Sequence, residues 1–253
     1  VEQHDADLIL SINLLGNPND YDAFPRKAQI LEDNCEAMGA VYGGRRTGSF
    51  GVMASHSTFY SHHICTGEGG LITTDDEEYY HMLLSLRSHG WTRHLPEKKK
   101  LWAKPDKFSF ILPGYNVRPT EIQSAVGIEQ LKKLPKIVAE RQEIARALND
   151  GAPVYLDRIP VRDGCEHVYY ALPFFVNQEY STSGVAEWIT RSSQIPVSRN
   201  YDGNLLTKPV SNTWVTPERQ RELSTTEAYR KTGRLMFIET CSYDITKDHI
   251  DSW

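Results

Sequence analysis

Two adjacent histidines, His62 and His63, are the residues of this chain whose types point most directly to acid–base chemistry. They lie in a segment from Ser57 to Gly70 that opens on a strand-like run through Tyr60 and closes on a glycine pair. We therefore predict a hairpin with the histidines where the backbone bends. An imidazole exchanges protons near neutral pH. Neighbouring residues of an extended chain point to opposite faces, so at most one of the two histidines can face a given pocket. The other would only pack.

A carboxylate follows a buried strand earlier in the chain. The apolar run Leu8–Leu15 predicts a strand of a parallel sheet, Asp20–Lys27 leaves room for a short helix, and Ile30–Asp33 reads as the next strand. Strand, helix and strand predict a right-handed βαβ unit. Ligands of such sheets bind beyond the carboxyl ends of the strands, which is where Asp33 falls. The alternative for Asp33 is a helix N-cap.

Composition restricts the class of protein. The 253 residues, 40% of them apolar, suffice for one large domain or two small ones. A net charge of -5 argues against non-specific nucleic-acid binding. There is no bilayer-length apolar run and no visible secretory signal, which predicts a cytoplasmic protein that binds no membrane. The four cysteines lie far apart without a C-x-x-C pair, which predicts reduced thiols and no metal site or iron–sulfur cluster.

The remaining elements are expected from periodicity and capping residues. We expect helices at 75–89, from Pro119 through Leu131, and at 136–149 after a break at Pro135, with loops at 90–100 and 112–119. A smaller unit would hold strands at 167–176 and 235–238, helices at 183–191 and 217–232 with Thr216 as N-cap, and a last short helix after Thr246. The predicted domains are 1–135 and 136–253.

Three pieces of sequence together resemble a known family. They are Glu32-Asp-Asn-Cys-Glu36 after a strand, the segment Ser57 to Gly70, and Gly114-Tyr-Asn-Val-Arg118. In this order they resemble the DegT/DnrJ/EryC1/StrS sugar-nucleotide aminotransferases and dehydratases over nearly the whole chain. The resemblance implies an α/β fold, aspartate-aminotransferase-like (PLP fold type I), with a mixed sheet, flanking helices and a smaller C-terminal α/β domain. Elements that precede Leu8 in the family have no counterpart here, so the N-terminal part of the large domain is expected to be missing.

The resemblance also assigns roles to single residues. Asp33 would pair with the pyridinium nitrogen of pyridoxal 5'-phosphate, and an ionised carboxylate there keeps the ring protonated as an electron sink. Ser57 would hold the cofactor phosphate, and Asn116 would reach the same phosphate from a neighbouring subunit, which implies a homodimer. Glu36 stands where the family often keeps a glutamine near the cofactor's phenolic oxygen.

The sequence departs from the common family pattern at His62, where aminotransferases carry the lysine that forms an imine with the cofactor. Histidine forms no stable imine, so pyridoxal or pyridoxamine 5'-phosphate would be held non-covalently, with His62 as acid and base. A histidine pair here resembles the branch that removes the 3-hydroxyl of nucleotide-linked 4-keto-6-deoxyhexoses. One version of that branch uses an iron–sulfur cluster, and the other reloads the cofactor from L-glutamate. The scattered cysteines favour the second.

Phrases at 90–93, 112–119 and 129–135 resemble the members of that branch that act on GDP-linked sugars. His63, Arg93 and Arg118 are then candidate substrate contacts, since a guanidinium group matches phosphate oxygens. The segment 198–204 departs from the family pattern, which leaves nucleotide recognition open.

Three alternatives remain. The chain could be a truncated or non-catalytic relative that binds a sugar nucleotide or a full-length partner subunit. It could be an aminotransferase with a displaced lysine such as Lys104 or Lys107. A metal site from His62, His63 and Cys65 is the weakest, because ligands at adjacent positions diverge.

Overall fold

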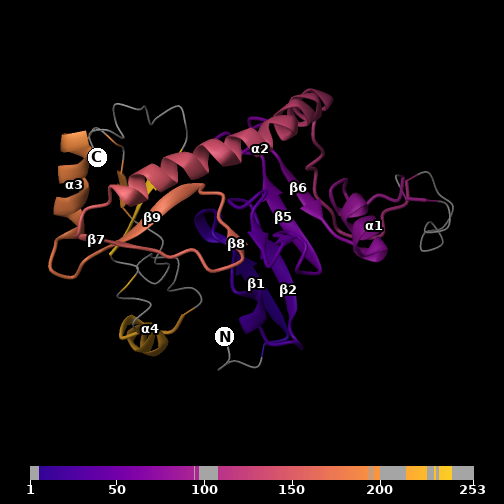
Figure 1. Cartoon of the computed structure of the whole chain (residues 1–253). Coiled ribbons are helices and arrows are strands. Elements are labelled where there is room, and N and C mark those ends of the chain that lie inside the picture. Colours follow the sequence, from indigo (N-terminus) through magenta and orange to yellow (C-terminus); the bar gives the residue numbers. More distant parts are fainter. Residues whose placement is uncertain are drawn as a thin grey trace. The chain divides into compact units, whose positions relative to one another are not determined.

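The computed structural model describes residues 6–93, 95–96, 108–193, 195, 197–199, 215–226, 231 and 234–240. Contacts divide the chain into two compact units (Figure 1). The first comprises Val1–Leu14 and Pro18–Leu134, and the second comprises Leu15–Asn17 and Pro135–Trp253.

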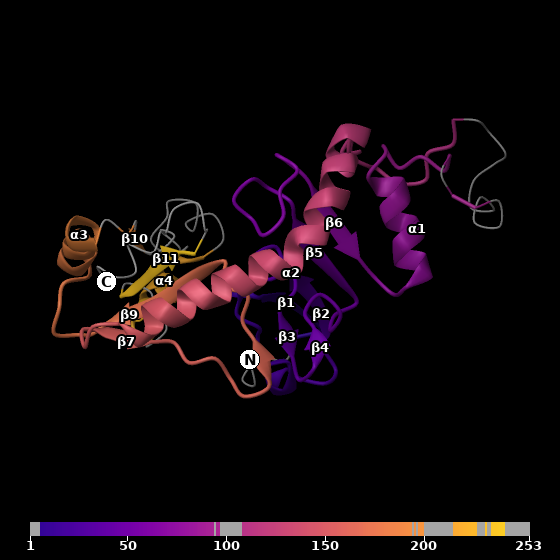
Figure 2. The ribbon, with the colours of Figure 1, turned by 45° about the horizontal axis from the view of Figure 1, so that its top comes forward.

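The first unit is built on a four-stranded sheet with the order β1-β2-β5-β6 (Figures 1 and 2). Its strands are β1 (Leu8–Ile12), β2 (Gln29–Asp33), β5 (Met53–Ser57) and β6 (Gly70–Thr73). The first three are parallel, and β6 is antiparallel to β5. The register pairs Asp33 with Ile12 on one side and with Ser55 on the other. Asp33 therefore ends a central strand at the carboxyl edge of the sheet, as predicted.

The connections of this sheet differ from those expected. Strand β1 ends at Ile12 rather than at Leu15, because Leu15 has a φ of 57° and the chain turns there through Leu14–Gly16. A single 3-10 turn, Tyr21–Ala23, replaces the expected helix before β2. After β2, the short strands β3 (Val41–Tyr42) and β4 (Arg45–Arg46) form a hairpin.

The segment that carries the histidines joins β5 to β6. Ser57 pairs with Gly70, so the predicted hairpin is confirmed. The prediction that Thr58 to Tyr60 continue the strand was wrong, because β5 ends at Ser57. Thr58 instead closes a loop: its N–H donates to the carbonyl of Gly69, and its carbonyl accepts from the N–H of Thr66.

Two helices complete the first unit. Helix α1 (Glu77–Leu86) has the acidic first turn expected of it and is capped by Asp76, whose carboxylate accepts from the N–H groups of Glu78 and Tyr79. Helix α2 (Glu121–Asp150) begins in the first unit and continues into the second. The expected break at Pro135 was wrong, since that residue lies inside α2. Proline has a helix-compatible φ, so it removes one hydrogen bond without ending the helix when the surroundings support it.

The second unit holds an antiparallel sheet with the order β10-β11-β9-β7. Its strands are β7 (Leu156–Arg158), β9 (Ala171–Val176), β10 (Val197–Arg199) and β11 (Leu235–Glu239), and the chain also forms β8 (Cys165–Glu166), α3 (Thr182–Ser193) and α4 (Pro217–Ser224). Phe174, Ile189 and Ile238 lie in the core with no exposed surface. The N-cap at Thr216 is confirmed by a hydrogen bond from the N–H of Arg219.

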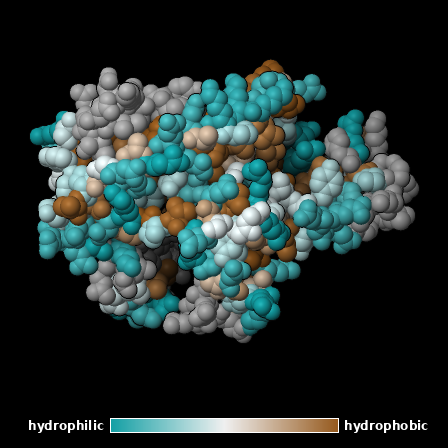
Figure 3. All heavy atoms as spheres, viewed as in Figure 1, coloured by the Kyte–Doolittle hydropathy of each residue, from teal (hydrophilic) through white to brown (hydrophobic). Residues whose placement is uncertain are grey.

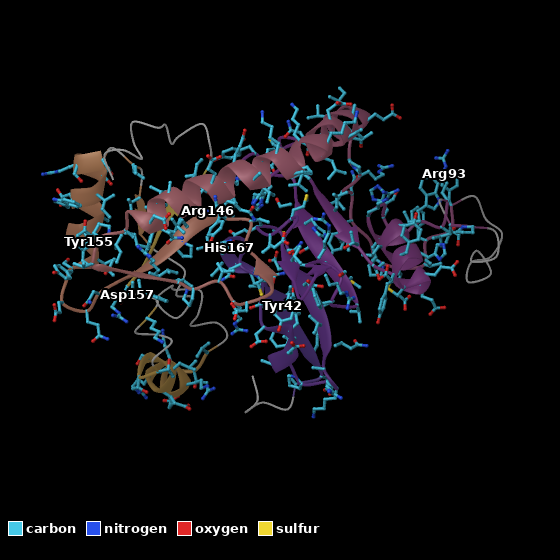
Figure 4. The ribbon with its side chains drawn as sticks, viewed as in Figure 1. Tyr42, Arg93, Arg146, Tyr155, Asp157 and His167 are labelled. Atoms are coloured by element: carbon cyan, nitrogen blue, oxygen red, sulfur yellow. The ribbon has the colours of Figure 1, made fainter. Side chains whose placement is uncertain are left out.

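Two expected elements of this unit are shorter than predicted. Strand β9 begins at Ala171 rather than at His167, because Tyr169 has a φ of 47°. The His167 ring (labelled in Figure 4) stacks on Tyr169 at 3.8 Å, and its Nδ1 accepts from the N–H of Tyr169. Helix α4 ends at Ser224 rather than at Thr232. The helix expected after Thr246 lies outside the described residues.

None of the described helices is both long enough and apolar enough to span a lipid bilayer.

Replacing Pro135 by alanine should stabilise the protein. The substitution restores an N–H that can donate to the carbonyl of Leu131 and removes the least favourable residue of α2, for a gain of about 2 kcal/mol. Urea denaturation measures the free energy of unfolding. Lys136→Ala, at the next position of the same helix, is the matched control and should change it by less than about 0.5 kcal/mol. An equal effect of the two variants would contradict the explanation.

Candidate functional site

The backbone of one residue, Cys35, connects the two side chains that the sequence placed in the site. Its N–H donates to Asp33 Oδ1 at 3.1 Å, and its carbonyl oxygen lies 2.5 Å from Nδ1 of His62. Asp33 heads an Asx-type turn, and β3 is the next element along the chain, so the helix N-cap alternative does not hold. The carboxylate of Asp33 and the imidazole of His62 thus both contact the backbone of the turn that follows β2.

The contact with Cys35 decides the tautomer of His62. A carbonyl oxygen can only accept, so Nδ1 must carry the proton and donate it. In the neutral ring the lone pair then resides on Nε2. His62 is half-buried, and the edge of its ring faces Phe59 at a centroid distance of 6.2 Å. The geometry suits Nε2 to a general base.

The second histidine faces a different environment. His63 is only 3% exposed, whereas His62 retains intermediate exposure. The two imidazoles therefore differ in exposure, although the backbone turns here and is not the extended chain on which the expectation was based. Burial of His63 favours contacts within the protein over a direct contact with a substrate.

Ser57 and Glu36 lie at the same edge of the sheet as Asp33. Ser57 is the last residue of β5, and its Oγ accepts from the N–H of Phe59 at 3.1 Å, so the hydroxyl proton is available to an anion. Glu36 is half-buried in the turn that follows Asp33.

Burial, together with a hydrogen bond to Asp33, raises the pKa of the Cys35 thiol to about 11. Cys35 is therefore a neutral thiol at physiological pH.

Arg118 lines a groove of about 490 Å³ between the histidine loop and α2. The same groove is lined by Thr58, Thr66 and Ile128, and Gln123 Nε2 donates to the carbonyl of Glu68 across it. The apolar residues of the N-terminal part of α2 are exposed beside it, and they appear as brown spheres at the upper right of Figure 3 (Ile122 79%, Ile128 60%, Leu131 54%).

The structure does not bring Arg93 to Asp33. Figure 4 shows Arg93 on the loop beyond α1, on the far side of that helix from β1 and β2. Its guanidinium lies over the ring of Trp91 at 5.1 Å. Asn116 is exposed, pairs with Ser88 in an isolated bridge, and accepts a hydrogen bond from Arg118 at 3.1 Å. Arg118 and Asn116 therefore form one exposed polar group.

A buried carboxylate, Glu32, was missed as a candidate for positioning the site. It is 2% exposed and accepts four hydrogen bonds, from the N–H groups of Gly48, Phe50 and Gly51 and from the hydroxyl of Tyr21. A buried charge is stable only when it is fully hydrogen-bonded in this way. Burial and this carboxylate raise the pKa of Tyr21 above its ordinary value. Tyr42, labelled in Figure 4, packs edge-on against Tyr21 at 5.3 Å.

A row of polar side chains continues from Glu32 across the sheet. It consists of Asn13, Asn34, His56 and Thr73, from residues in or just after β1, β2, β5 and β6. A signal was present in the sequence: Ser11, Asn13, Glu32 and Asn34 alternate with apolar or site residues, which is the period of one strand face. The opposite face at these positions carries Asp33.

No group of three histidine, cysteine, aspartate or glutamate side chains within the described part of the chain could hold a metal ion. Lys104 and Lys107, the residues of the displaced-lysine alternative, and the segment 200–204 lie outside the described residues.

Comparison with known proteins decides the family. The sequence profile of the DegT/DnrJ/EryC1/StrS aminotransferase family matches residues 3–233. The chain belongs to this family. A solved GDP-4-keto-6-deoxymannose-3-dehydratase, a histidine-to-asparagine mutant with bound GDP-perosamine, superposes with a TM-score of 0.80 at 36% identity. That alignment covers 97% of this chain and 66% of the other. The aspartate-aminotransferase-like α/β fold is thereby confirmed.

The resemblance to the 3-dehydratase branch is confirmed as well. GDP-4-keto-6-deoxy-D-mannose 3-dehydratase of Escherichia coli O55:H7 is 53% identical over 153 residues, 56% of this chain and 39% of that protein. A second structure, GDP-4-keto-6-deoxymannose-3-dehydratase with a trapped PLP-glutamate geminal diamine, has a TM-score of 0.77 at 36% identity and covers 93% of this chain and 64% of the other. The chain thus spans about two fifths of its curated relative and about two thirds of the solved ones.

Replacing Glu32 by glutamine should destabilise the first unit strongly. The amide would present an N–H₂ group to donors that now meet a carboxylate, at a cost of about 3 kcal/mol. Urea denaturation measures the loss. Glu143→Gln, at an exposed position of α2, is the matched control and should change the free energy of unfolding by less than about 0.5 kcal/mol. A loss below about 1 kcal/mol for Glu32→Gln would show that the carboxylate is dispensable.

Proposed function

We propose that this chain removes the 3-hydroxyl of a GDP-linked 4-keto-6-deoxyhexose, using non-covalently bound pyridoxamine 5'-phosphate and L-glutamate as the source of its amine. The observation that carries the proposal is the double contact of Cys35, which brings the Asp33 carboxylate and the His62 imidazole together. The protein would act as a homodimer in the cytoplasm.

The residues present suit the cofactor. Asp33 Oδ1 is already engaged by Cys35, and a carboxylate has further lone pairs that could accept a hydrogen bond from the N–H of a pyridinium ring. Ser57 offers a hydroxyl proton to a phosphate at the same sheet edge, and Glu36 lies in the adjoining turn. The segment from Ser57 to Gly70 holds no lysine, so no side chain in it can form an imine with the cofactor. When bound and protonated at its ring nitrogen, pyridoxamine phosphate supplies an electron sink.

The work of this chain is then to hold and move protons. Asp33 keeps the ring nitrogen protonated because an anion beside it favours the charged form. Cys35 holds Nδ1 of His62 in its protonated form, so Nε2 is the atom that takes a proton from the reacting carbon. The imidazolium so formed can return that proton to the hydroxide that leaves C3. A lysine would instead recapture the cofactor, so the histidine favours elimination.

Binding of the substrate is assigned to exposed cations. Arg118 and the hydrogen-bonded Asn116 present one polar group on the outside of the first unit, and Arg93 presents another beyond α1. Groups this exposed suit a site completed by a second subunit, with Asn116 reaching the cofactor phosphate of its partner. A GDP-linked sugar and glutamate are favoured because solved relatives contain GDP-perosamine and a PLP-glutamate adduct. His63 is buried and is the weakest of the proposed substrate contacts.

His62→Asn tests the proposed base directly. Asparagine cannot accept and return the proton, so C3 deoxygenation of the GDP-sugar should fall by at least about 10²-fold. Pyridoxamine phosphate should still bind, as its absorbance after gel filtration would show. His167→Gln, a histidine of the second unit, is the control and should keep the wild-type rate. Wild-type turnover by His62→Asn would contradict the role. A wild-type chain that retains no pyridoxamine phosphate would favour the non-catalytic alternative.

His62→Lys tests the position of the side chain. An amine at this point should form a covalent adduct with pyridoxal phosphate, seen as visible absorbance and as a borohydride-stable mass increase on the peptide that contains residue 62. His63→Lys is the matched control and should give no adduct, because residue 63 is buried. An adduct on residue 63 alone would reverse the assignment of the two histidines.

A further inference from the structure

Asn34 occupies the one position between Asp33 and Cys35, the two residues from which the proposed site is built. It has no exposed surface. Its N–H donates to the carbonyl of Ser55, and its carbonyl accepts from the N–H of Ala37. Its backbone is therefore held on both sides, and its side chain points to the face of the sheet opposite Asp33, where it joins Asn13 and His56.

The direction of the hydrogen bonds along this row can be deduced from a backbone group. The N–H of Asn19 donates to Oδ1 of Asn13, which fixes the orientation of that amide. Asn13 Nδ2 must then donate to Asn34 Oδ1 at 3.0 Å. Asn34 Nδ2 is left to donate to Nδ1 of His56 at 3.3 Å.

His56 consequently has one tautomer. Its Nδ1 accepts from Asn34, so the proton is on Nε2, which donates to Thr73 Oγ1 at 3.1 Å. The Thr73 hydroxyl donates in turn to the carbonyl of Gly48 at 3.3 Å. Every bond from Asn13 to Gly48 thus runs in the same direction, and a reversal at one residue would place two donors or two acceptors face to face.

The close packing of Gly48 independently indicates that the Asn34–His56 contact is a specific part of the fold. It has a φ of 86°, and a Cβ there would lie 2.7 Å from Cε1 of His56 and 3.2 Å from Nδ2 of Asn34. The N–H of the same glycine donates to Glu32 at 2.6 Å. The backbone that follows β4 therefore closes directly over this pair, with no room for a side chain at residue 48.

We propose that Asn34 and His56 are a positioning pair for the site: their partly buried hydrogen bond sets the orientation of the turn that holds Asp33 and, through Cys35, His62. The proposal rests on the proposed function, because the orientation of the turn matters only if Asp33 and His62 take part in the reaction. Neither residue touches the reacting atoms, since both side chains lie on the other face of the sheet. Their effect passes through the backbone of residues 33 to 35.

The pair requires a neutral His56. A proton on Nδ1 would face the N–H₂ group of Asn34. The Asn34 amide cannot flip to offer its oxygen, because that oxygen accepts a hydrogen bond from Asn13. Burial lowers the pKa of His56 below its ordinary value of 6.5, and the carboxylates of Glu32 and Asp33, both on β2, act in the opposite sense. Because the folded-state pKa is lowered, the contribution to stability is present above about pH 6.5 and is lost as the pH falls through the folded-state pKa.

The test is nuclear magnetic resonance of the whole chain with ¹⁵N-labelled imidazoles, together with titration with pyridoxamine phosphate. We expect His56 at neutral pH as the Nε2–H tautomer. Asn34→Asp is isosteric and turns an acceptor oxygen toward Nδ1, so it should raise the pKa of His56 by about one unit or more, move the His62 signals, and weaken cofactor binding about tenfold.

A second pair of variants separates positioning from stability. His56→Asn keeps an acceptor where Nδ1 stood and should retain the wild-type His62 signals, whereas His56→Leu should shift them. Thr74→Val removes a hydrogen bond from the Thr74 hydroxyl to the carbonyl of Val52, elsewhere in the same unit, and is the control for stability alone. It should leave both the His62 signals and cofactor affinity unchanged.

Two results would overturn the proposal. One is an Nδ1–H tautomer for His56 in the wild type. The other is a set of variants, Asn34→Asp and His56→Leu, that lower the free energy of unfolding yet leave the His62 signals as they are in the wild type. The imidazole measurements need no cofactor, so a wild-type chain that fails to bind pyridoxamine phosphate would contradict the proposed function alone.

Discussion

The hydrogen bonds of Cys35 are the constraint on which the proposed chemistry depends. A carboxylate at the end of one strand and an imidazole in the loop after another are 29 residues apart in sequence (33 to 62), and the backbone N–H and carbonyl of a single residue hold both. Backbone groups carry no charge and do not titrate, so they can orient an acid and a base without competing for their protons. The arrangement leaves Nε2 of His62 as the reactive nitrogen.

This turn is supported by hydrogen-bonded polar groups of the sheet, of which Glu32, Asn13 and Asn34 are buried, His56 is half-buried and Thr73 is exposed. A carboxylate with four donors, Glu32, anchors the loop from Gly48 to Gly51, and the row from Asn13 to Thr73 links the four strands on the face opposite Asp33. Buried polar groups are costly unless every donor and acceptor is matched. Once matched, they permit fewer arrangements than an apolar core, because each bond has a direction as well as a length. The smaller number of possible arrangements helps to hold the turn at this sheet edge in one orientation.

The chain belongs to a family named for aminotransferases, but one of its site residues departs from the aminotransferase pattern. The family is named for aminotransferases, and its profile covers most of the chain. The residue that departs from the aminotransferase pattern, His62, is the one that the structure ties to Asp33 through Cys35. An imidazole exchanges protons as a lysine can but forms no stable imine, and this difference is the chemical basis of the proposed elimination.

Much of this could be read from the sequence, and the physical reasons are local. Apolar runs and their terminal residues identified β2, β11, α1 and α3, and the turn residues identified the hairpin from Ser57 to Gly70. The motifs around Asp33 and His62 indicated the family, because side-chain types at fixed spacing survive independently of the details of packing. The sequence alone also predicted that at most one of His62 and His63 could face a given pocket, and it left open which of the two is the base.

Only the tertiary structure decided the rest, because it depends on contacts between distant residues. The helix passes through Pro135 although the residue's local preference predicted a break, and just before β9 the N–H groups of Val168 and Tyr170 donate to the distant carbonyls of Gly16 and Leu15. The tautomer of His62 follows from a carbonyl 27 residues away, and the burial of Glu32 follows from the loop that closes over it. The direction of each hydrogen bond is a property of the folded chain, because it depends on which donors and acceptors meet, and no local pattern encodes it.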